Sequence, residues 1–194
     1  MKLGTLFVIS APSGGGKTSL VNALLAHQEF KDILARVVTY TSRQPRPGDI
    51  HGQDYYFIQE MEFVAFIEKG FFIEWSVAYG TYYGTPAKVL EDLAQGNSRI
   101  VILDRTGAKN IAIAYPEAIL IWIVPPSIEV LTRRLQGRGT ENRAQIERRI
   151  ALAVIEMESE VKNPLFSHYI TNDFFEVSLN SLKNIVIFAL KLKK

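Results

Sequence analysis

The sequence predicts an α/β fold with a central parallel sheet, because strand-like and helix-like segments alternate along most of the chain. Leu6 to Ser10 form a short apolar run, and a helical pattern follows from Lys17 to Ala26. Ala118 to Val124 are apolar throughout, which is typical of a parallel strand that is covered on both faces. The connections between strands and helices are short, and this favours parallel strands joined through helices.

The other elements of this alternation follow in order. We expect a strand from Ile100 to Asp104 and a helix from Thr106 to Ala114. The residues "PPS" precede a helical pattern from Ser127 to Gln136, and serine is favoured at a helix start. A last short strand is expected from His168 to Thr171, before a helix from Val177 to Lys191 with apolar residues at helical spacing.

Two segments interrupt the alternation. Arg36 to Tyr83 gather aromatic residues and valine in strand-like clusters, with one helical pattern near Met61 to Lys69. Gly137 to Glu160 open with "GRGTENR" and continue as a long, charged helix. We expect a small β-rich insertion in the first segment and a helical flap in the second.

Composition and charge exclude several function classes. The chain has 194 residues, of which 47% are hydrophobic, and this suits one compact unit with a sizeable core. Its formal net charge of +2 does not favour a nucleic-acid polymer or an anionic membrane as partner. Its longest apolar stretches are far shorter than a membrane span, and it contains no cysteine. We expect a cytoplasmic protein that attracts anions only locally.

The stretch "FVISAPSGGGKTSL" has the order of a phosphate-binding loop, although Ala11 stands where the strict pattern has glycine. Its glycines let successive backbone N–H groups point at an anion, and the helix that follows adds a partial positive charge. Lys17 offers a charge for nucleotide phosphates, and the Thr18 hydroxyl offers a ligand for Mg²⁺. A flexible turn with a solvated lysine is the alternative. The residues of the predicted loop are Ala11, Pro12, Ser13, Gly14, Gly15, Gly16, Lys17, Thr18 and Ser19.

A second anion site is predicted in "TYTSRQPRPGDIHGQDYYF", where Arg43 and Arg46 lie in a loop that is rich in proline and glycine. Guanidinium groups match phosphate oxygens, and the prolines stiffen the loop that holds them. Tyr55 and Tyr83 could donate from neutral hydroxyls to the same phosphate. Taken alone, this loop is also typical of an exposed basic turn.

The motifs "SAPSGGGKTSL", "TSRQPRPGDIHGQDYYF", "FIEW", "YYGT", "RRLQGRG" and "ITND" occur in this order. Together they resemble bacterial guanylate kinases over essentially the whole chain. The resemblance implies a three-layer fold of the P-loop NTPase type and an enzyme that transfers the γ-phosphoryl group of ATP to GMP or dGMP, with Mg²⁺ as cofactor. It implies a single domain with three parts, which are a core that binds ATP (about 1–35, 84–126 and 161–194), a GMP-binding subdomain (about 36–83) and a lid (about 127–160).

The resemblance also implies roles for single residues. Arginines and tyrosines of the second site hold the GMP phosphate, and Glu74 reads guanine, whose N1–H and N2–H₂ donors suit a carboxylate. The residues expected at GMP are Thr39, Arg43, Arg46, Tyr55, Glu74, Tyr83, Thr85 and Asp104. The residues expected to act in catalysis, three of them arginines of the lid region, are Lys17, Arg134, Arg138 and Arg149.

The chain departs from the family pattern at the strand before Gly107. Where guanylate kinases have D-x-D-x-Q-G, this chain has Ile102, Asp104 and Thr106 at the three polar positions. Thr18, the nucleotides and Asp104 suffice for Mg²⁺ under one hypothesis, because Mg²⁺ uses few carboxylates. A shifted strand that brings Asp104 into the missing role and a reduced activity are the alternatives.

Two further hypotheses compete with this kinase. One is a guanylate-kinase-like binding module, which the intact Lys17 and Thr18 disfavour. The other is a related kinase with a different phosphorylated acceptor, which Glu74, Arg43 and Arg46 disfavour. The sequence makes no prediction of oligomeric state.

Overall fold

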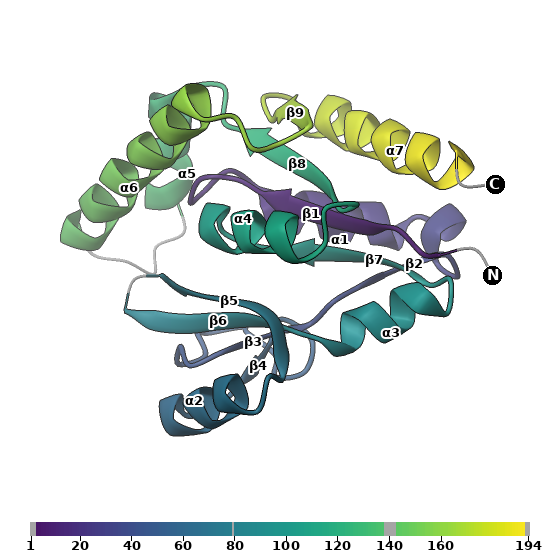
Figure 1. Ribbon diagram of the computed structural model, residues 1–194. Helices are drawn as coiled ribbons and strands as arrows, with labels where there is room; N and C mark the ends of the chain where they lie inside the picture. The colour runs from purple at the N-terminus through teal and green to yellow at the C-terminus, as the bar shows by residue number, and fades with distance from the viewer. Residues whose placement is uncertain (1–2, 79, 138–142, 193–194) are drawn as a thin grey trace.

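The computed structural model describes residues 3–78, 80–137 and 143–192, and it contains two β-sheets with helices around the larger one (Figure 1). The larger sheet has the strand order β2-β7-β1-β8-β9, and all its pairings are parallel. The predicted α/β fold with a central parallel sheet is therefore confirmed. The strands of this sheet are β1 (Leu6–Ser10), β2 (Leu34–Arg36), β7 (Ser98–Ile102), β8 (Ile119–Val124) and β9 (His168–Thr171).

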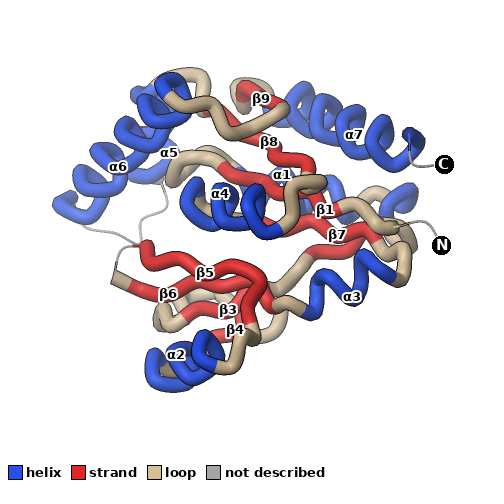
Figure 2. Tube along the Cα trace, in the orientation of Figure 1, coloured by secondary structure: helices blue, strands red, loops and turns tan. Residues whose placement is uncertain are grey.

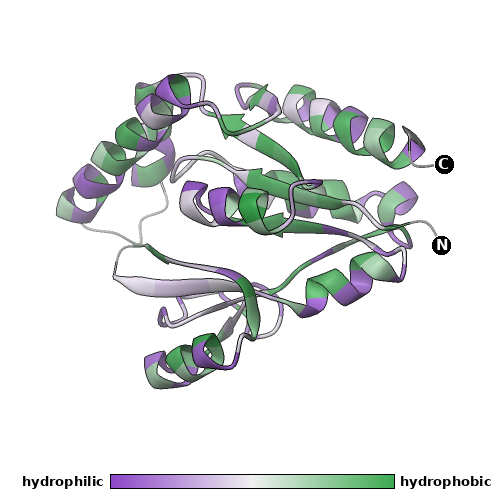
Figure 3. Cartoon of the chain, in the orientation of Figure 1, coloured by the Kyte–Doolittle hydropathy of each residue, from purple (hydrophilic) through white to green (hydrophobic). Residues whose placement is uncertain are grey.

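Helices cover both faces of this sheet. Side chains on its central strand β1 point alternately to opposite faces, and they are apolar on both, so each face needs a covering layer. Phe7 and Ile9 pack in one apolar cluster with α1 and α7, whereas Leu6 and Val8 pack in another with α3 and α4. Figure 3 shows the strands between these helices as mostly hydrophobic. The fold therefore has three layers, with the larger sheet between two layers of helices. The helices are α1 (Lys17–Ala26), α3 (Lys88–Ala94), α4 (Arg105–Ala114) and α7 (Phe175–Leu192), and a short 3₁₀ helix follows α1 (Gln28–Phe30).

The smaller sheet lies beside the first and has the strand order β4-β3-β6-β5 (Figure 2). Its core is aromatic, with Phe63 stacked on Phe72 at 4.5 Å and Tyr40 stacked on Tyr56 at 4.7 Å between ring centroids. The predicted β-rich segment and its one helix are present. The elements are β3 (Thr39–Thr41), β4 (Tyr55–Phe57), α2 (Glu60–Glu68), β5 (Phe72–Ala78) and β6 (Thr81–Pro86).

Helices α5 (Ile128–Gln136) and α6 (Arg143–Lys162) pack against each other through Leu131, Leu135 and Ala153. The Ser127 hydroxyl accepts from Val130 N at 3.3 Å and caps α5, as its sequence predicts. The long charged helix expected before Glu160 is α6. In the described part of the chain, no helix is both long and apolar enough to cross a lipid bilayer.

The structure corrects one predicted strand. β7 runs from Ser98 to Ile102 instead of Ile100 to Asp104, so the chain has already left the sheet at Asp104. The Asp104 carboxylate instead accepts from Gly107 N at 2.6 Å and caps α4. A capping aspartate must lie outside the helix and the strand, and the apolar pattern alone did not reveal this. The sequence analysis also missed β2 and α3.

The two faces of α4 give a test of the core. Ile111 is fully buried between α4 and the larger sheet, whereas Ile113 is 72% exposed on the same helix. We expect Ile111→Ala to lower the free energy of unfolding by about 2 to 5 kcal/mol, because it removes buried methyl groups and leaves a cavity. Ile113→Ala is the matched control and should change it by less than about 0.5 kcal/mol. Urea unfolding measures both, and equal losses would contradict the packing described.

Candidate active site

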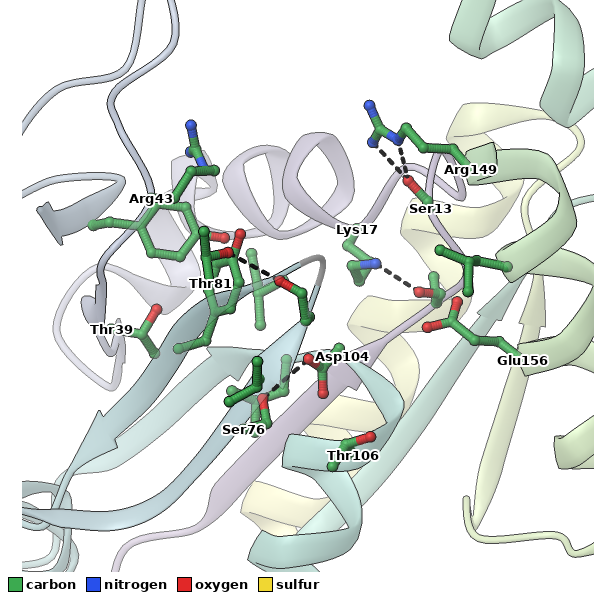
Figure 4. Close-up of a pocket in the computed structure, with 18 of the residues that line it drawn as sticks. Ser13, Lys17, Thr39, Arg43, Ser76, Thr81, Asp104, Thr106, Arg149 and Glu156 are labelled. Atoms are coloured by element: carbon green, nitrogen blue, oxygen red, sulfur yellow. Dashed lines mark hydrogen bonds between the residues drawn. The ribbon is translucent and has the colours of Figure 1, made fainter. Parts of the chain in front are cut away.

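A cleft of about 620 Å³ lies where the glycine loop after β1, the smaller sheet and α6 meet. Figure 4 shows Lys17 and Arg149 on one side of this cleft and Arg43 on the other. Residues from distant parts of the sequence therefore converge at one place. The predicted site residues that line the cleft are Ala11, Ser13, Lys17, Thr39, Arg43, Arg46, Tyr55, Glu74, Tyr83, Asp104 and Arg149.

Other predicted residues lie around the cleft without lining it. Thr85 is fully buried behind Glu74, and Arg134 lies on α5. Thr18 and Ser19 are exposed in the first turn of α1. Arg138 lies outside the described residues. The remaining members of this group belong to the glycine loop and are Pro12, Gly14, Gly15 and Gly16.

The glycine loop has the conformation that its sequence requires. Gly14 and Gly16 have φ angles of 88° and 93°, which residues other than glycine rarely adopt. Gly15 N donates to Pro12 O at 2.9 Å, so the loop closes on itself before α1 begins. The Lys17 ammonium group donates to Ala11 O at 2.6 Å and is held across the loop. Backbone N–H groups at the start of α1 and this ammonium group are donors of the kind that suit an anion.

Asn172, which lies just after β9, fixes the glycine loop through its side-chain amide. Its Nδ2 donates to Gly15 O at 3.0 Å, and a Cβ on Gly16 would clash with this nitrogen. Arg134 in turn donates to Asn172 O at 2.8 Å. The motif "ITND" therefore has a structural role, which is to hold the loop in shape.

Asp49 organises the loop that carries the two arginines. Its carboxylate accepts from Arg46 N at 2.7 Å and from the Arg43 guanidinium group at 2.8 Å. Burial alone would raise the pKa of Asp49, but these donors hold it below its ordinary value. Arg43 also lies over the rings of Tyr55 and Phe57, at 5.6 and 5.5 Å from their centroids. Its guanidinium group is thus oriented before any anion arrives.

Tyr55 and Tyr83 lie together beside this loop, with ring centroids 6.0 Å apart. Burial and the neighbouring Tyr83 raise the pKa of the Tyr55 hydroxyl above its ordinary value. The Tyr55 hydroxyl therefore stays neutral and remains a donor near neutral pH. Two hydroxyls and two arginines line this end of the cleft.

Glu74 is a buried carboxylate that faces the cleft from β5. Its Oε1 accepts from the Thr85 hydroxyl at 2.6 Å, whereas its buried Oε2 has no hydrogen-bond partner among the described residues. Burial and the nearby Asp104 charge raise the pKa of Glu74 to about 7, although the Thr85 hydrogen bond opposes the shift. An unpaired buried acceptor costs free energy unless a ligand supplies a donor. Glu74 is thus suited to bind a donor-rich edge of a ligand.

Asp104 connects the two sheets at the bottom of the cleft. While its Oδ1 caps α4, its Oδ2 accepts from the Ser76 hydroxyl on β5 at 3.1 Å. Farther along α4, Asn110 Nδ2 donates to Trp75 O at 2.9 Å. These contacts fix β5, and with it Glu74, against the larger sheet.

Arg149 on α6 reaches the glycine loop. Its Nε and one terminal nitrogen both donate to the Ser13 hydroxyl, at 2.8 and 2.6 Å. The Arg149 guanidinium group of α6 therefore lies next to the glycine loop. This contact joins residues that are 136 positions apart in the sequence.

Asp49, Ser76, Glu156 and Asn172 were not predicted as site residues. A proline- and glycine-rich loop with one aspartate was a usable signal for Asp49, and the motif containing Asn172 was another. Neither spacing nor composition pointed to Ser76 or Glu156. In the described ranges, no group of three or more His, Asp or Glu side chains could hold a metal ion by itself.

Comparisons with known proteins identify the family of the chain. The family model described as guanylate kinase matches residues 4–188. The guanylate kinase of Dechloromonas aromatica is 41% identical over 184 residues, which cover 94% of this chain and 88% of the relative. The Escherichia coli K12 guanylate kinase is 41% identical over 187 residues, covering 96% and 88% of the two chains. The crystal structure of a guanylate kinase from Anaplasma phagocytophilum superposes with a TM-score of 0.79 at 26% identity, covering 98% and 88% of the two chains. From the matched length and these identities, the chain belongs to the guanylate kinase family.

Proposed function

We propose that this protein is a guanylate kinase that transfers the γ-phosphoryl group of ATP to GMP or dGMP, giving ADP and GDP from ATP and GMP. The observation that carries this proposal is the single cleft that unites the glycine loop, the two loop arginines and buried Glu74. Each of these groups matches one part of the two substrates. The relatives named guanylate kinase support the same reaction.

In this proposal GMP lies at the smaller sheet, which forms the acceptor part of the enzyme. Arg43 and Arg46 bind its phosphate with the hydroxyls of Tyr55 and Tyr83, because guanidinium groups and phenols are matched donors for phosphate oxygens. Glu74 accepts from guanine N1–H and N2–H₂, with Thr39, Thr85 and Asp104 around it. Adenine lacks the 2-amino donor, so AMP leaves a buried acceptor unpaired at a cost of about 1 to 3 kcal/mol.

ATP is proposed to bind at the glycine loop, where backbone N–H groups, Lys17, Thr18 and Ser19 face its phosphates. Phosphoryl transfer needs positioning and positive charge around the moving group, and it needs no protein nucleophile. Lys17 and Arg149 supply this charge from the loop and from α6. Arg134 and Arg138 are the other two residues that we propose to act in catalysis. Closure of α5 and α6 as a lid would exclude water, which competes with GMP as acceptor.

Mg²⁺ is the proposed cofactor, and the donor set fits it. The exposed Thr18 hydroxyl and the Asp104 carboxylate at the cleft provide hard oxygen atoms, and Mg²⁺ takes only one or two carboxylates beside substrate phosphates. When bound, Mg²⁺ neutralises charge on the transferring phosphates. A cytoplasmic location, and the expectation that neither a nucleic-acid polymer nor a membrane is a partner beside ATP and GMP, remain predictions.

The proposal is tested by coupled measurement of ADP release with ATP, Mg²⁺ and GMP, with AMP and a phosphorylated ribose as control acceptors. Release that depends on GMP supports the kinase. Release with a phosphorylated ribose instead would favour a different acceptor. Binding of GMP without release of ADP would favour the binding module.

Lys17→Ala should abolish transfer while the protein stays folded. The variant removes the ammonium group that faces the phosphates, so we expect kcat to fall by at least about a hundredfold. Lys109→Ala, on the exposed side of α4, is the matched control and should leave kcat unchanged. Circular dichroism verifies the fold of both variants. Full turnover by Lys17→Ala would remove Lys17 from the phosphate site.

Arg43→Ala should chiefly weaken GMP binding. Loss of a charge-assisted contact to phosphate of about 1.5 to 3 kcal/mol corresponds to about ten- to hundredfold in Kd. Calorimetry with guanosine, which has no phosphate, serves as the control and should show little change between the two proteins. If both ligands weaken equally, Arg43 acts on the smaller sheet and not on the phosphate.

GMP binding should weaken as the pH falls from 8 to 6. The pKa of Glu74 is raised to about 7, so its carboxyl group gains a proton in this range and loses acceptor capacity for guanine. We expect Kd to rise toward about tenfold per pH unit below that pKa. Calorimetry on the Glu74→Gln variant provides the baseline, because the GMP phosphate titrates alike with both proteins. Parallel pH profiles for the two proteins would contradict this role of Glu74.

A further inference from the structure

Glu156 on α6 presents a carboxylate to the cleft that the roles given above do not use. It lines the cleft together with Lys17, Ile102 and Asp104. Figure 4 shows its side chain extending from α6 toward Lys17 and the glycine loop. Its Oε2 is buried and accepts no hydrogen bond from any described residue.

The charges around Glu156 mark it as part of the phosphate region. Burial raises the pKa of this carboxyl group, and so does the Asp104 charge, whereas the charges of Lys17 and Arg105 lower it. The charges that act on Glu156 are therefore those of the glycine-loop lysine, of the carboxylate that caps α4 and of Arg105. An ionised carboxylate in this place repels nucleotide phosphates unless a cation lies between them.

The other acidic groups nearby have protein partners. Glu74 accepts from Thr85 with one oxygen, while its unpaired oxygen is the one assigned to guanine in the proposed complex. Both oxygens of Asp104 accept hydrogen bonds, from Gly107 and Ser76. Glu160, one turn farther along α6, is an example of a carboxylate whose hydrogen bonds are supplied by the protein. It accepts from Leu165 N, Phe166 N, the Tyr169 hydroxyl and the Arg105 guanidinium group. Glu156 has no comparable set among the described residues, and its burial carries a cost without one.

We propose that Glu156 supplies a carboxylate oxygen to the Mg²⁺ that accompanies the nucleotide, directly or through a metal-bound water. The proposal rests on the kinase function proposed above and assigns it a further residue. Ile102 offers no polar atom at the end of β7, so the carboxylate from α6 provides negative charge that this strand end lacks. Mg²⁺ commonly uses one or two carboxylates together with phosphate oxygens, and Asp104 and Glu156 complete that number.

This assignment links the metal to α6. Arg149, two turns before Glu156, contacts Ser13 of the glycine loop from the same helix. One helix thus brings a cation to the phosphates and a carboxylate to the metal that neutralises them. Both contacts would form or be lost together if α6 moves.

The test compares ADP binding with and without a metal ion in the wild type and in Glu156→Gln. Mn²⁺ replaces Mg²⁺, because electron paramagnetic resonance then reports bound Mn²⁺ independently of turnover. We expect Glu156→Gln to bind Mn²⁺ about tenfold more weakly in the presence of ADP, since an anionic carboxylate is replaced by a neutral amide whose single oxygen is a weaker metal ligand. Without metal, calorimetry should show ADP binding tightened by about twofold, because a like charge has been removed.

Glu158→Gln is the matched control, since Glu158 is exposed on the same helix and pairs with Lys162 at 3.7 Å. It changes the net charge equally and should leave both measurements unchanged. If Glu156→Gln alters ADP binding equally with and without Mn²⁺, or alters neither, the proposal is overturned. If Mn²⁺ fails to bind to the wild type with ADP, the proposed kinase function itself is overturned. Thermal unfolding of each variant verifies that the comparison is made on folded protein.

Discussion

The hydrogen bond from Asn172 to Gly15 is the constraint on which the site depends. It fixes a glycine loop whose own backbone angles are unfavourable for other residues, and Asn172 does so from its place directly after β9, the strand at the edge of the larger sheet. Asn172 N also donates to Val124 O at 2.7 Å, so the order of the strands sets the position of the amide. The loop can therefore keep its shape while empty, and the free energy of nucleotide binding is not spent on ordering it.

The Asp104 carboxylate helps to hold the second sheet in place, beside the contact of Asn110 with Trp75 O. Asp104 caps α4 with one oxygen and accepts from Ser76 on β5 with the other, so helix start and sheet position are fixed by the same side chain. Glu74 lies two residues before Ser76 on β5, so the contact of Ser76 with Asp104 also fixes the position of Glu74. A structural capping residue thus determines where guanine is read in the proposed complex. The departure from the family pattern at Ile102 leaves this connection intact.

Much of the fold follows from local sequence patterns, and much of the site does not. The glycine cluster between an apolar run and Lys17 predicted β1 and α1 at their observed bounds. The shift of β7 was missed because an aspartate at a strand end and one at a helix cap read alike in an apolar pattern. The contact of Asn172 with Gly15 spans 157 positions, and that of Ser76 with Asp104 spans 28. Such pairs depend on strand order and helix packing, which no short motif contains.

The contact of Arg149 with Ser13 has a consequence for product release. Any phosphate that recruits this arginine must displace a hydroxyl that already accepts from two of its nitrogens. The net gain is the difference between the bonds of this guanidinium group to an anionic phosphate and its bonds to a neutral hydroxyl, because a pair of opposite charges is attracted more strongly than a charge and a neutral group. When the nucleotide departs, the same hydroxyl takes the arginine back. In the proposed enzyme, Ser13 thus gives Arg149 a neutral partner beside the glycine loop when ADP leaves.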